Sequence, residues 1–398
     1  MKGFTSILSL ASAVIGVACA EPIYDAIIIG GGPSGLSALS GLARVRRNAL
    51  LIDSGEYRNN PTRHMHDVIG FDGVTPAYYR WAARSQISHY PTASAINGTV
   101  TSVDALNNNT LFTAHTTFPN GTSAPLSARK LVLATGLRDL IPSTPGLLEN
   151  WGKGIFWCPW CDGHEHADQS LGLLVPLEEA ASSAREIATL NKDVIAFVNG
   201  TDTPAARDAA ERSFPEWERY LAINNVRVEN RTIARISRLR DGAAHPADPS
   251  LPTAPELDLF RVDFAEGEGG APVERAAFFA SFPDAQKSDV GERMGVQLWG
   301  GRLAADGTRG LATNVPGVYA VGDANSDNVT NVPHALFSGK RTAVYLHVQL
   351  AREEAQRQLA ANSTDTDTAA VAKRALDLRS VWEEMNPRDI LYAGEFDQ

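Results

Sequence analysis

Uninterrupted apolar runs, bounded by polar or glycine-rich segments, recur along the chain. Residues 23–29 (Ile-Tyr-Asp-Ala-Ile-Ile-Ile) and 49–53 (Ala-Leu-Leu-Ile-Asp) are two such runs near its start. Strands of a parallel sheet are buried on both faces, so they are continuously apolar rather than alternating. Residues 36–43, between the two runs, are small and mostly apolar, which favours a helix packed closely on a sheet. The pattern therefore predicts a β-α-β unit here.

A similar succession returns in the middle of the chain. Residues 171–177 and 193–198 are predicted to be strands, and residues 178–190 and 204–220 are predicted to be helices. Strands that alternate with helices are typical of an α/β fold with parallel sheets. The length of 398 residues is sufficient for two domains that each have a core of their own.

The first twenty residues have the pattern of a secretory signal peptide. Lys2 precedes an apolar run over residues 4–17, and Ala18-Cys19-Ala20 follows before Glu21. The run is too short for a membrane span. Asn-x-Ser/Thr sequons, which are acceptors for N-glycosylation, occur at Asn97, Asn108, Asn120, Asn199, Asn230, Asn328 and Asn362. We therefore expect residues 1–20 to be removed and the mature protein to be a secreted glycoprotein.

The charges are dispersed and sum to −10 at neutral pH. A nucleic-acid or anionic-lipid surface requires clustered Lys and Arg side chains, and the sequence has no such cluster. We expect neither a nucleic-acid partner nor a membrane partner.

A glycine-rich turn follows the first predicted strand directly. It consists of Gly30, Gly31, Gly32, Pro33, Ser34 and Gly35, which is G-x-G-x-x-G between a strand and a helix. Such a turn places backbone N–H groups and a helix N-terminus against a pyrophosphate. Asp53 ends the next strand 18 residues after Gly35, where a carboxylate can bind a ribose hydroxyl. These residues predict a dinucleotide site without deciding between FAD and NAD.

Only two cysteines lie outside the predicted signal peptide, Cys158 and Cys161, and they are separated by Pro159 and Trp160. A disulfide between them would be either structural or redox-active. Structural disulfides stabilise most when they close long loops, and this one would close a very short loop. Cys-x-x-Cys spacing also lowers thiol pKa values toward neutrality. Both arguments favour a redox centre.

Two further motifs make the chain resemble the pyridine nucleotide–disulfide oxidoreductases. Leu133-Ala134-Thr135-Gly136 is similar to the strand end that closes the first FAD segment of that superfamily, and residues 313–324 end in the pair Gly322-Asp323. The resemblance implies FAD as the cofactor, with Asp323 hydrogen-bonded to its ribityl chain. Cys158-Pro-Trp-Cys161-Asp162-Gly163 follows the Ala-Thr-Gly segment, as in the thioredoxin reductase branch.

That branch implies two Rossmann-like three-layer domains in an α/β fold, with the FAD domain interrupted by an inserted nucleotide-binding-like domain. We expect a signal peptide over 1–20, an FAD domain over 21–148 and 293–350, the inserted domain over 149–292 and a helical extension over 351–398. The extension includes an apolar helical pattern over residues 370–385. The branch also implies a homodimer.

The resemblance assigns roles around the redox pair. Cys161 would face the flavin, Cys158 would be the interchange thiol that meets the substrate, and Asp162 would be the acid/base. His164 and His166 could also supply a base. Further candidates near the cofactor are Arg58, His66, Ala134, His334 and Ala335, with His334 as a possible base for the substrate thiol. His64 and His66 form a His-x-His pair, but no further ligand has a telling spacing, so we expect no metal.

The inserted domain departs from the reductase pattern. Its expected NADPH turn, residues 173–180, contains no glycine and places Glu178 and Glu179 in the first helical turn, where carboxylates repel a phosphate. The next strand is followed by Asn199-Gly200-Thr201-Asp202 rather than by basic residues. A degenerate NADPH site leaves a dithiol substrate as the electron donor and O₂ as the acceptor. This pattern resembles the fungal thioredoxin reductase-like dithiol oxidases of the gliotoxin oxidase type, which often have His in place of Asp162.

Several functions remain open on the sequence. A secreted FAD-dependent dithiol oxidase that produces H₂O₂ is the preferred interpretation, with a small-molecule or protein dithiol as substrate. Protein sulfhydryl oxidation is its nearest rival. Two more functions are compatible with the sequence: an NAD(P)H-dependent reductase with an unusual cofactor site, and a flavin-binding protein without enzymatic activity.

Overall fold

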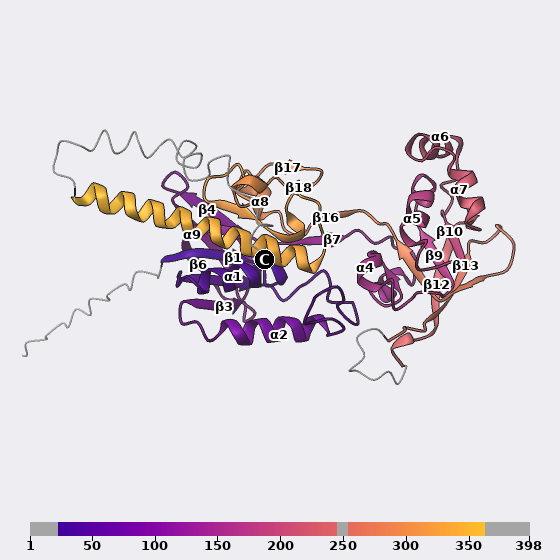
Figure 1. The fold of residues 1–398 in the computed structure, drawn as a ribbon, viewed down its shortest axis with the longest axis horizontal. Helices are drawn as coiled ribbons and strands as arrows, with labels where there is room; N and C mark the ends of the chain where they lie inside the picture. The colour runs from indigo at the N-terminus through magenta and orange to yellow at the C-terminus, as the bar shows by residue number, and fades with distance from the viewer. Residues whose placement is uncertain (1–22, 245–253, 363–398) are drawn as a thin grey trace, which may run out of the picture.

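A computed structural model describes residues 23–244 and 254–362, which form two lobes (Figure 1). The predicted signal peptide and the predicted helix at 370–385 lie outside the described residues. None of the helices in the described part has the length and apolar character needed to cross a membrane. The lobes are joined by two short antiparallel strands, β7 (Leu137–Asp139) and β16 (Asp284–Gln286).

The first lobe is built on a seven-stranded sheet in the order β3-β2-β1-β6-β5-β4, with β19 beside β6. Its parallel strands are β1 (Ile23–Ile29), β2 (Ala49–Asp53), β3 (Ala93–Asn97), β6 (Ser123–Leu133) and β19 (Val318–Ala320). The antiparallel edge is formed by β4 (Thr99–Leu106) and β5 (Leu111–Thr117). β1 and β2 agree with the predicted strands because both are continuously apolar.

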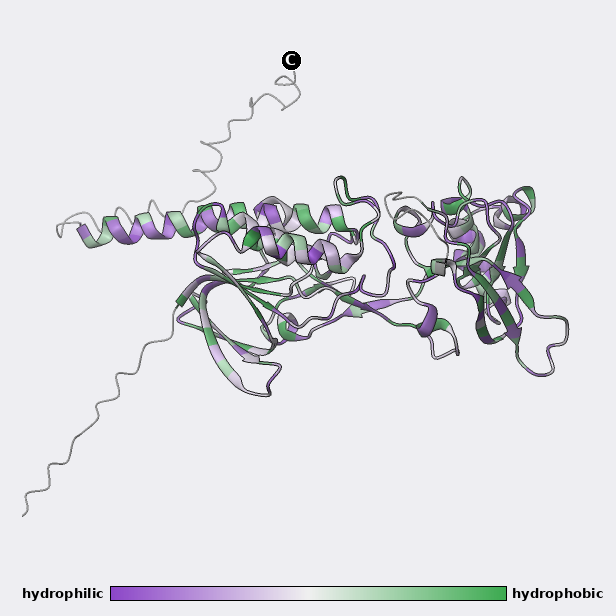
Figure 2. Ribbon diagram, turned by 90° about the horizontal axis from the view of Figure 1, so that it is seen from below, coloured by the Kyte–Doolittle hydropathy of each residue, from purple (hydrophilic) through white to green (hydrophobic). Residues whose placement is uncertain are grey.

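Both faces of this sheet are covered. Ala26 and Ile28 of β1 contact a core shared with α1 (Pro33–Ala43) and α9 (Val332–Asn362), whereas Ile27 and Ile29 contact a core on the opposite face. The green strands inside both lobes in Figure 2 show this concentration of apolar residues. The other elements of the lobe are α2 (Pro76–Ile87), α8 (Val290–Arg293), β17 (Leu298–Trp299) and β18 (Arg302–Leu303).

The second lobe repeats the three-layer plan. Its parallel sheet has the order β11-β10-β9-β15-β8, formed by β8 (Ile155–Phe156), β9 (Leu171–Leu174), β10 (Val194–Phe197), β11 (Arg227–Glu229) and β15 (Ala277–Ala280). One face packs on α5 (Ala180–Ile187), α6 (Pro204–Ser213) and α7 (Trp217–Ile223). The other packs on β12 (Ile233–Arg240), β13 (Leu259–Phe264) and β14 (Val273–Arg275). The predicted α/β class with two Rossmann-like domains is confirmed.

Two predicted elements of this lobe are corrected. The helix expected over 204–220 is broken, because α6 ends at Ser213 and α7 begins at Trp217. Pro215 lies in the break and has no N–H for a helical hydrogen bond. The strand expected over 171–177 ends at Leu174, since Pro176 precedes a short 3₁₀ turn over Leu177–Glu179.

Candidate active site

A cavity of about 710 Å³ opens at the ends of β1 and β6 and extends to the second lobe. It brings together segments that are far apart in the sequence. Most of the predicted site residues line it: Gly30, Gly31, Gly32, Pro33, Ser34, Arg58, His66, Ala134, Cys161, Asp162, Asp323 and Ala335. Its volume is within the range of small-molecule and cofactor sites.

The glycine turn has the shape that a dinucleotide requires. A Cβ on Gly35 would lie 1.9 Å from the Gly30 carbonyl oxygen, so only glycine allows α1 to pack this closely on β1. Gly30 has φ +118°, a conformation that other residues rarely adopt. A Cβ on Gly32 would meet nothing within 4 Å, so the turn leaves room for a phosphate at this point. The residues present fit FAD.

Asp53 lies behind the turn rather than in the cavity wall. It is 1% exposed, and its Oδ2 accepts a hydrogen bond from the Tyr57 hydroxyl at 2.6 Å and pairs with Arg84. Its Oδ1 accepts from the Gly55 N–H at 2.9 Å. Both carboxylate oxygens therefore have protein partners, and ribose binding by Asp53 stays a prediction.

Arg58 connects the cavity to the strands between the lobes. Its guanidinium donates to Asp323 Oδ2 at 3.1 Å and to Asp139 Oδ1 at 2.6 Å, and Asp139 ends β7. Burial raises the pKa of Asp323, although the charge of Arg58 opposes the shift. Arg58 thus holds the Asp323 carboxylate at the cavity wall.

The redox pair lies on the second lobe and faces the first. Cys158 precedes the single helical turn α4 (Pro159–Asp162), and its Sγ is disulfide-bonded to Cys161. Cys161 lines the cavity, whereas Cys158 is partly exposed outside it. Trp160, between the two cysteines, is 73% exposed. Cys161 therefore lies at the cofactor cavity, and the role of Cys158 as the interchange thiol stays a prediction.

Asp162 is the ionisable group at the junction of the disulfide and the cavity. Burial raises its pKa to about 7. The charges of His166 and Arg63 lower this value, whereas Glu256 and Glu165 raise it further. A carboxyl group that titrates near neutral pH is suited to accept and return a thiol proton.

The two predicted histidines of the cavity are placed differently. His66 lines the cavity. Its Nδ1 lies 3.6 Å from Asp72 Oδ1, and its Nε2 lies 3.6 Å from Glu165 Oε1. His334 lies in the first turn of α9, where the cavity is lined by Val332, Pro333 and Ala335. The His334 Nε2 atom lies 2.6 Å from Asp327 Oδ2, so this ring nitrogen already has a carboxylate partner. Its role as a base stays a prediction.

A second cavity, of about 400 Å³, lies at the carboxyl ends of β9 and β10, where α/β sheets bind nucleotides. Its walls are largely apolar, and the charged side chain in its lining is Glu179. Pro176 in the β9 turn lacks an N–H that a phosphate could accept. Arg207, which follows β10, pairs with Asp202 at 2.5 Å and Glu218 at 2.6 Å.

Sequence reasoning did not find the charged contacts around Asp162. Arg63 contacts Asp258 Oδ2 at 2.8 Å and Glu256, and it contacts Asp241 at 2.6 Å. These carboxylates come from irregular segments almost two hundred residues later in the chain, so no local spacing indicates them. The stretch between Asp241 and Asp258 is no richer in charged residues than the rest of the chain, so composition gives no signal either.

This fold and this site define an FAD-dependent disulfide oxidoreductase. The model of the family "Pyridine nucleotide-disulphide oxidoreductase" matches residues 24–194. A relative from Arthroderma benhamiae, named "Probable thioredoxin reductase", is 45% identical over 363 residues and covers 90% of this chain and 88% of its own. The chain therefore belongs to the thioredoxin reductase-like family of pyridine nucleotide–disulfide oxidoreductases.

Further comparisons agree with this assignment. "Thioredoxin reductase tcpT" from Claviceps purpurea is 30% identical and covers 80% of this chain and 91% of its own. The crystal structure of HlmI superposes with a TM-score of 0.70 at 30% identity, and the match covers 85% of this chain and 96% of HlmI. The family is FAD-dependent, as the cofactor prediction required.

Proposed function

We propose that this protein is a secreted FAD-dependent dithiol oxidase, in which a dithiol substrate reduces the Cys158–Cys161 disulfide and dioxygen is the final acceptor. The observation that carries the proposal is the contrast between the two crevices. The first has a glycine turn with open space at Gly32, whereas the second has Pro176 and Glu179 where a nicotinamide cofactor would bind.

The two sulfurs divide the reaction between them. A substrate thiolate attacks Cys158 Sγ, and the Cys158–Cys161 bond breaks as a mixed disulfide forms. Cys161 leaves as a thiolate on the cavity side. The second substrate thiol attacks the substrate sulfur of the mixed disulfide and releases Cys158. The substrate has then lost two electrons and two protons and leaves as a disulfide, and the enzyme holds a dithiol.

Asp162 and the cavity complete the cycle. Asp162 accepts the proton of the attacking thiol, for which its pKa of about 7 is suited. The chemistry that FAD supplies when bound is two-electron acceptance from the Cys158–Cys161 dithiol, with dioxygen as the last acceptor and hydrogen peroxide as its product.

Secretion is part of the proposal. It is supported by the signal-peptide pattern in the sequence and by the surface position of every sequon asparagine: Asn97, Asn108, Asn120, Asn199, Asn230, Asn328 and Asn362 are all exposed. Loss of mass from the exported protein on treatment with an endoglycosidase would support it.

The second candidate function is an NAD(P)H-dependent disulfide reductase. It is favoured by the names of the relatives, which are thioredoxin reductases, and by the presence of a cavity at the expected nucleotide crevice. In this case electrons would flow from NAD(P)H to Cys158 and Cys161, and then to a disulfide substrate. Protein sulfhydryl oxidation differs from our proposal only in the size of the dithiol.

Oxygen uptake by the holoenzyme tests the proposal. Dithiothreitol and a reduced protein, supplied side by side, distinguish small from macromolecular substrates. Cys158→Ser should retain flavin, because this sulfur lies outside the cavity, yet should lose dithiol-dependent oxygen uptake. Unchanged uptake in that variant would contradict the proposal.

A further inference from the structure

The His166 side chain is buried beneath the redox turn. It is 1% exposed and stacks on Phe156, with ring centroids 5.3 Å apart. Its Nδ1 lies 2.8 Å from the backbone carbonyl oxygen of Asp162, the last residue of α4. The imidazole is thus bonded directly to the turn that carries Cys158, Cys161 and Asp162.

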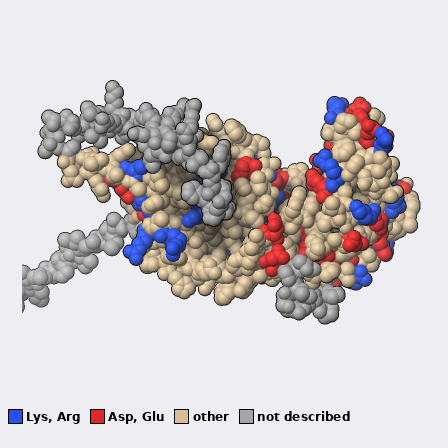
Figure 3. Space-filling model, viewed as in Figure 1, with Lys and Arg blue, Asp and Glu red and all other residues tan. Residues whose placement is uncertain are grey.

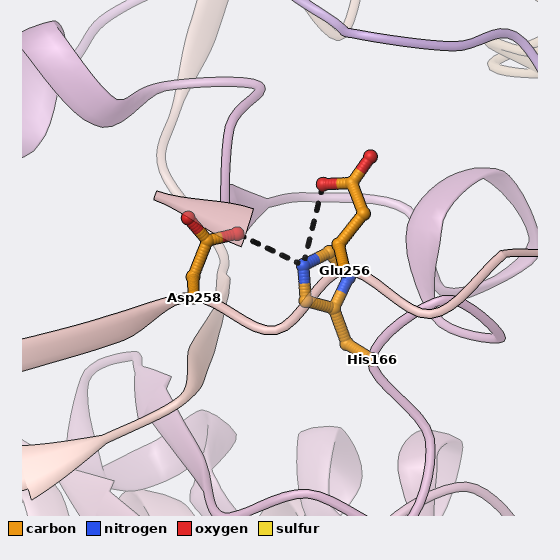
Figure 4. Close-up of side chains that lie close together, drawn as sticks. All are labelled: His166, Glu256 and Asp258. Carbon is orange, nitrogen blue, oxygen red and sulfur yellow. Dashed lines mark ion pairs between the residues drawn. The ribbon is translucent and has the colours of Figure 1, made fainter. Parts of the chain in front are cut away.

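This hydrogen bond decides which ring nitrogen carries the first proton. A carbonyl oxygen accepts hydrogen bonds and cannot donate, so Nδ1 must be the N–H donor. Nε2 then faces Glu256 Oε2 at 3.7 Å and Asp258 Oδ2 at 3.8 Å (Figure 4). It is buried and has no hydrogen-bond partner among the described residues. A neutral ring would direct a lone pair at two carboxylates, whereas a protonated ring directs an N–H at them.

The same three residues could be considered as a metal site, since their ligand atoms lie within 4.8 Å of one another. Arg63 argues against a metal. Its Nη1 contacts Asp258 Oδ2 at 2.8 Å and also contacts Glu256 Oε2, the same two oxygens that face His166. A divalent cation between them would meet the guanidinium at close range. Arg63 and Arg238, which pairs with Asp258 Oδ1, already place two guanidinium groups on these carboxylates.

We propose that His166 is a positioning residue held as a buried imidazolium, which fixes the redox turn through the Asp162 carbonyl and favours the ionised form of the Asp162 side chain. The effect of His166 on turnover rests on the proposed function. The charge state of His166 does not, because it is inferred from the geometry alone.

The electrostatics around the ring agree with this assignment. Burial by itself would lower the pKa of His166. Three groups raise this pKa: Asp258 and the Asp162 carbonyl through hydrogen bonding, and Glu256 through its charge. The imidazolium in turn lowers the pKa of Asp162, which burial has raised to about 7. The other ionisable groups that face this region from the packed segments are Arg63, His64, His66, Glu165, Arg238 and Asp241.

A variant without the imidazolium should therefore ionise Asp162 only at higher pH. His166→Gln retains an amide that can donate to the Asp162 carbonyl but removes the charge. His164→Gln is the matched control, because His164 belongs to the same turn and is exposed. His166→Lys restores a positive charge at the position.

The first readout needs no substrate. Asp162 lines the flavin cavity, so its ionisation should perturb the absorbance of the oxidised flavin as pH is varied. We expect a transition near pH 7 in the wild type and in His164→Gln, and its absence in Asp162→Asn. In His166→Gln the transition should move up by about one pH unit, and His166→Lys should move it back. The acidic limb of dithiol-dependent flavin reduction should shift by the same amount.

The second readout is the charge state of His166 itself, by nitrogen-15 NMR of histidine-labelled holoenzyme. An imidazolium signal that persists at pH 7 and disappears in His166→Gln supports the proposal, even if that variant loses flavin. A neutral His166 at pH 7, or an unshifted flavin transition in folded His166→Gln, would overturn it. An enzyme that dithiols cannot reduce, but whose His166 is protonated, would instead refute the oxidase function and leave this inference standing.

Discussion

At the scale of single residues, the proposed chemistry of the redox turn depends on the Asp162 carboxyl group. Burial beside the flavin cavity disfavours its charge, and the nearby carboxylates of Glu256 and Glu165 add to this effect. Without the opposing cations the group would remain protonated at neutral pH and could not accept a thiol proton. In the proposed mechanism, His166 and Arg63 are therefore needed to lower the pKa of Asp162.

Asp162→Asn should slow dithiol-dependent flavin reduction by about 10²–10⁴-fold, the usual contribution of a general base. The wild-type rate should fall as the pH is lowered through about 7, because protonated Asp162 cannot accept the proton. The variant should lose this dependence. Stopped-flow flavin reduction across pH 5–9, with anaerobic dithiothreitol, measures both effects, and an unchanged pH profile would remove Asp162 from the mechanism.

At the scale of elements, the two βα turns differ in how closely their backbones can approach a phosphate. The turn between β1 and α1 is tightly packed at Gly35 and open at Gly32. The turn after β9 contains Pro176, which precedes a 3₁₀ segment that includes Glu178 and Glu179. The same architecture thus produces one dinucleotide cradle and one crevice whose proline and glutamates are unfavourable to a phosphate.

Gly35→Ala should reduce the free energy of unfolding of the apoprotein by about 1–3 kcal/mol or more, since the new Cβ would overlap the Gly30 carbonyl. Gly32→Ala is the matched variant: its Cβ meets nothing within 4 Å, so stability should stay near wild type while FAD retention falls. Urea unfolding and the ratio of flavin to protein absorbance separate the two effects. Equal stability of the two variants would show that the close packing at Gly35 is not required.

The elements that could be predicted from the sequence are those marked by a pattern of neighbouring residues, such as an apolar run or a glycine-rich turn. The apolar runs identified β1 and β2, and the glycine turn lies where the strand–helix pattern placed it. The break at Pro215 was missed because helical apolar spacing continues on both sides of it. The contacts of His166 with Glu256 and Asp258 join residues some ninety positions apart, and such contacts depend on the packing of the lobe.

At the scale of the whole molecule, the site depends on how the second lobe is held against the first. Arg63, from the segment between β2 and α2, contacts Asp241, Glu256 and Asp258 of the second lobe. The same face of that lobe carries the redox turn. Acidic and basic side chains are mixed over the second lobe in the view of Figure 3, so the ion pairs at the junction are one part of a dispersed charge pattern.

Arg63→Gln should destabilise the protein by about 1–3 kcal/mol, because Glu256 loses its arginine partner and Asp258 keeps only that of Arg238. Arg207→Gln is the control, since Arg207 forms an exposed ion pair with Asp202 and its loss should cost much less. Urea unfolding compares the two variants, and small-angle X-ray scattering should show a wider separation of the lobes in Arg63→Gln alone. Comparable losses of stability in both variants would argue against a role of Arg63 in docking the two lobes.

Light scattering on the wild type would test the expected homodimer.

The direction of electron flow is the central claim, and anaerobic stopped-flow mixing of the FAD-loaded enzyme tests it most directly. One syringe delivers dithiothreitol and, in a parallel experiment, NADPH, while the flavin absorbance band is followed. The account predicts rapid bleaching with the dithiol, none with NADPH, and recovery of the band with hydrogen peroxide release once oxygen is admitted. Rapid bleaching by NADPH, with no response to the dithiol, would contradict it.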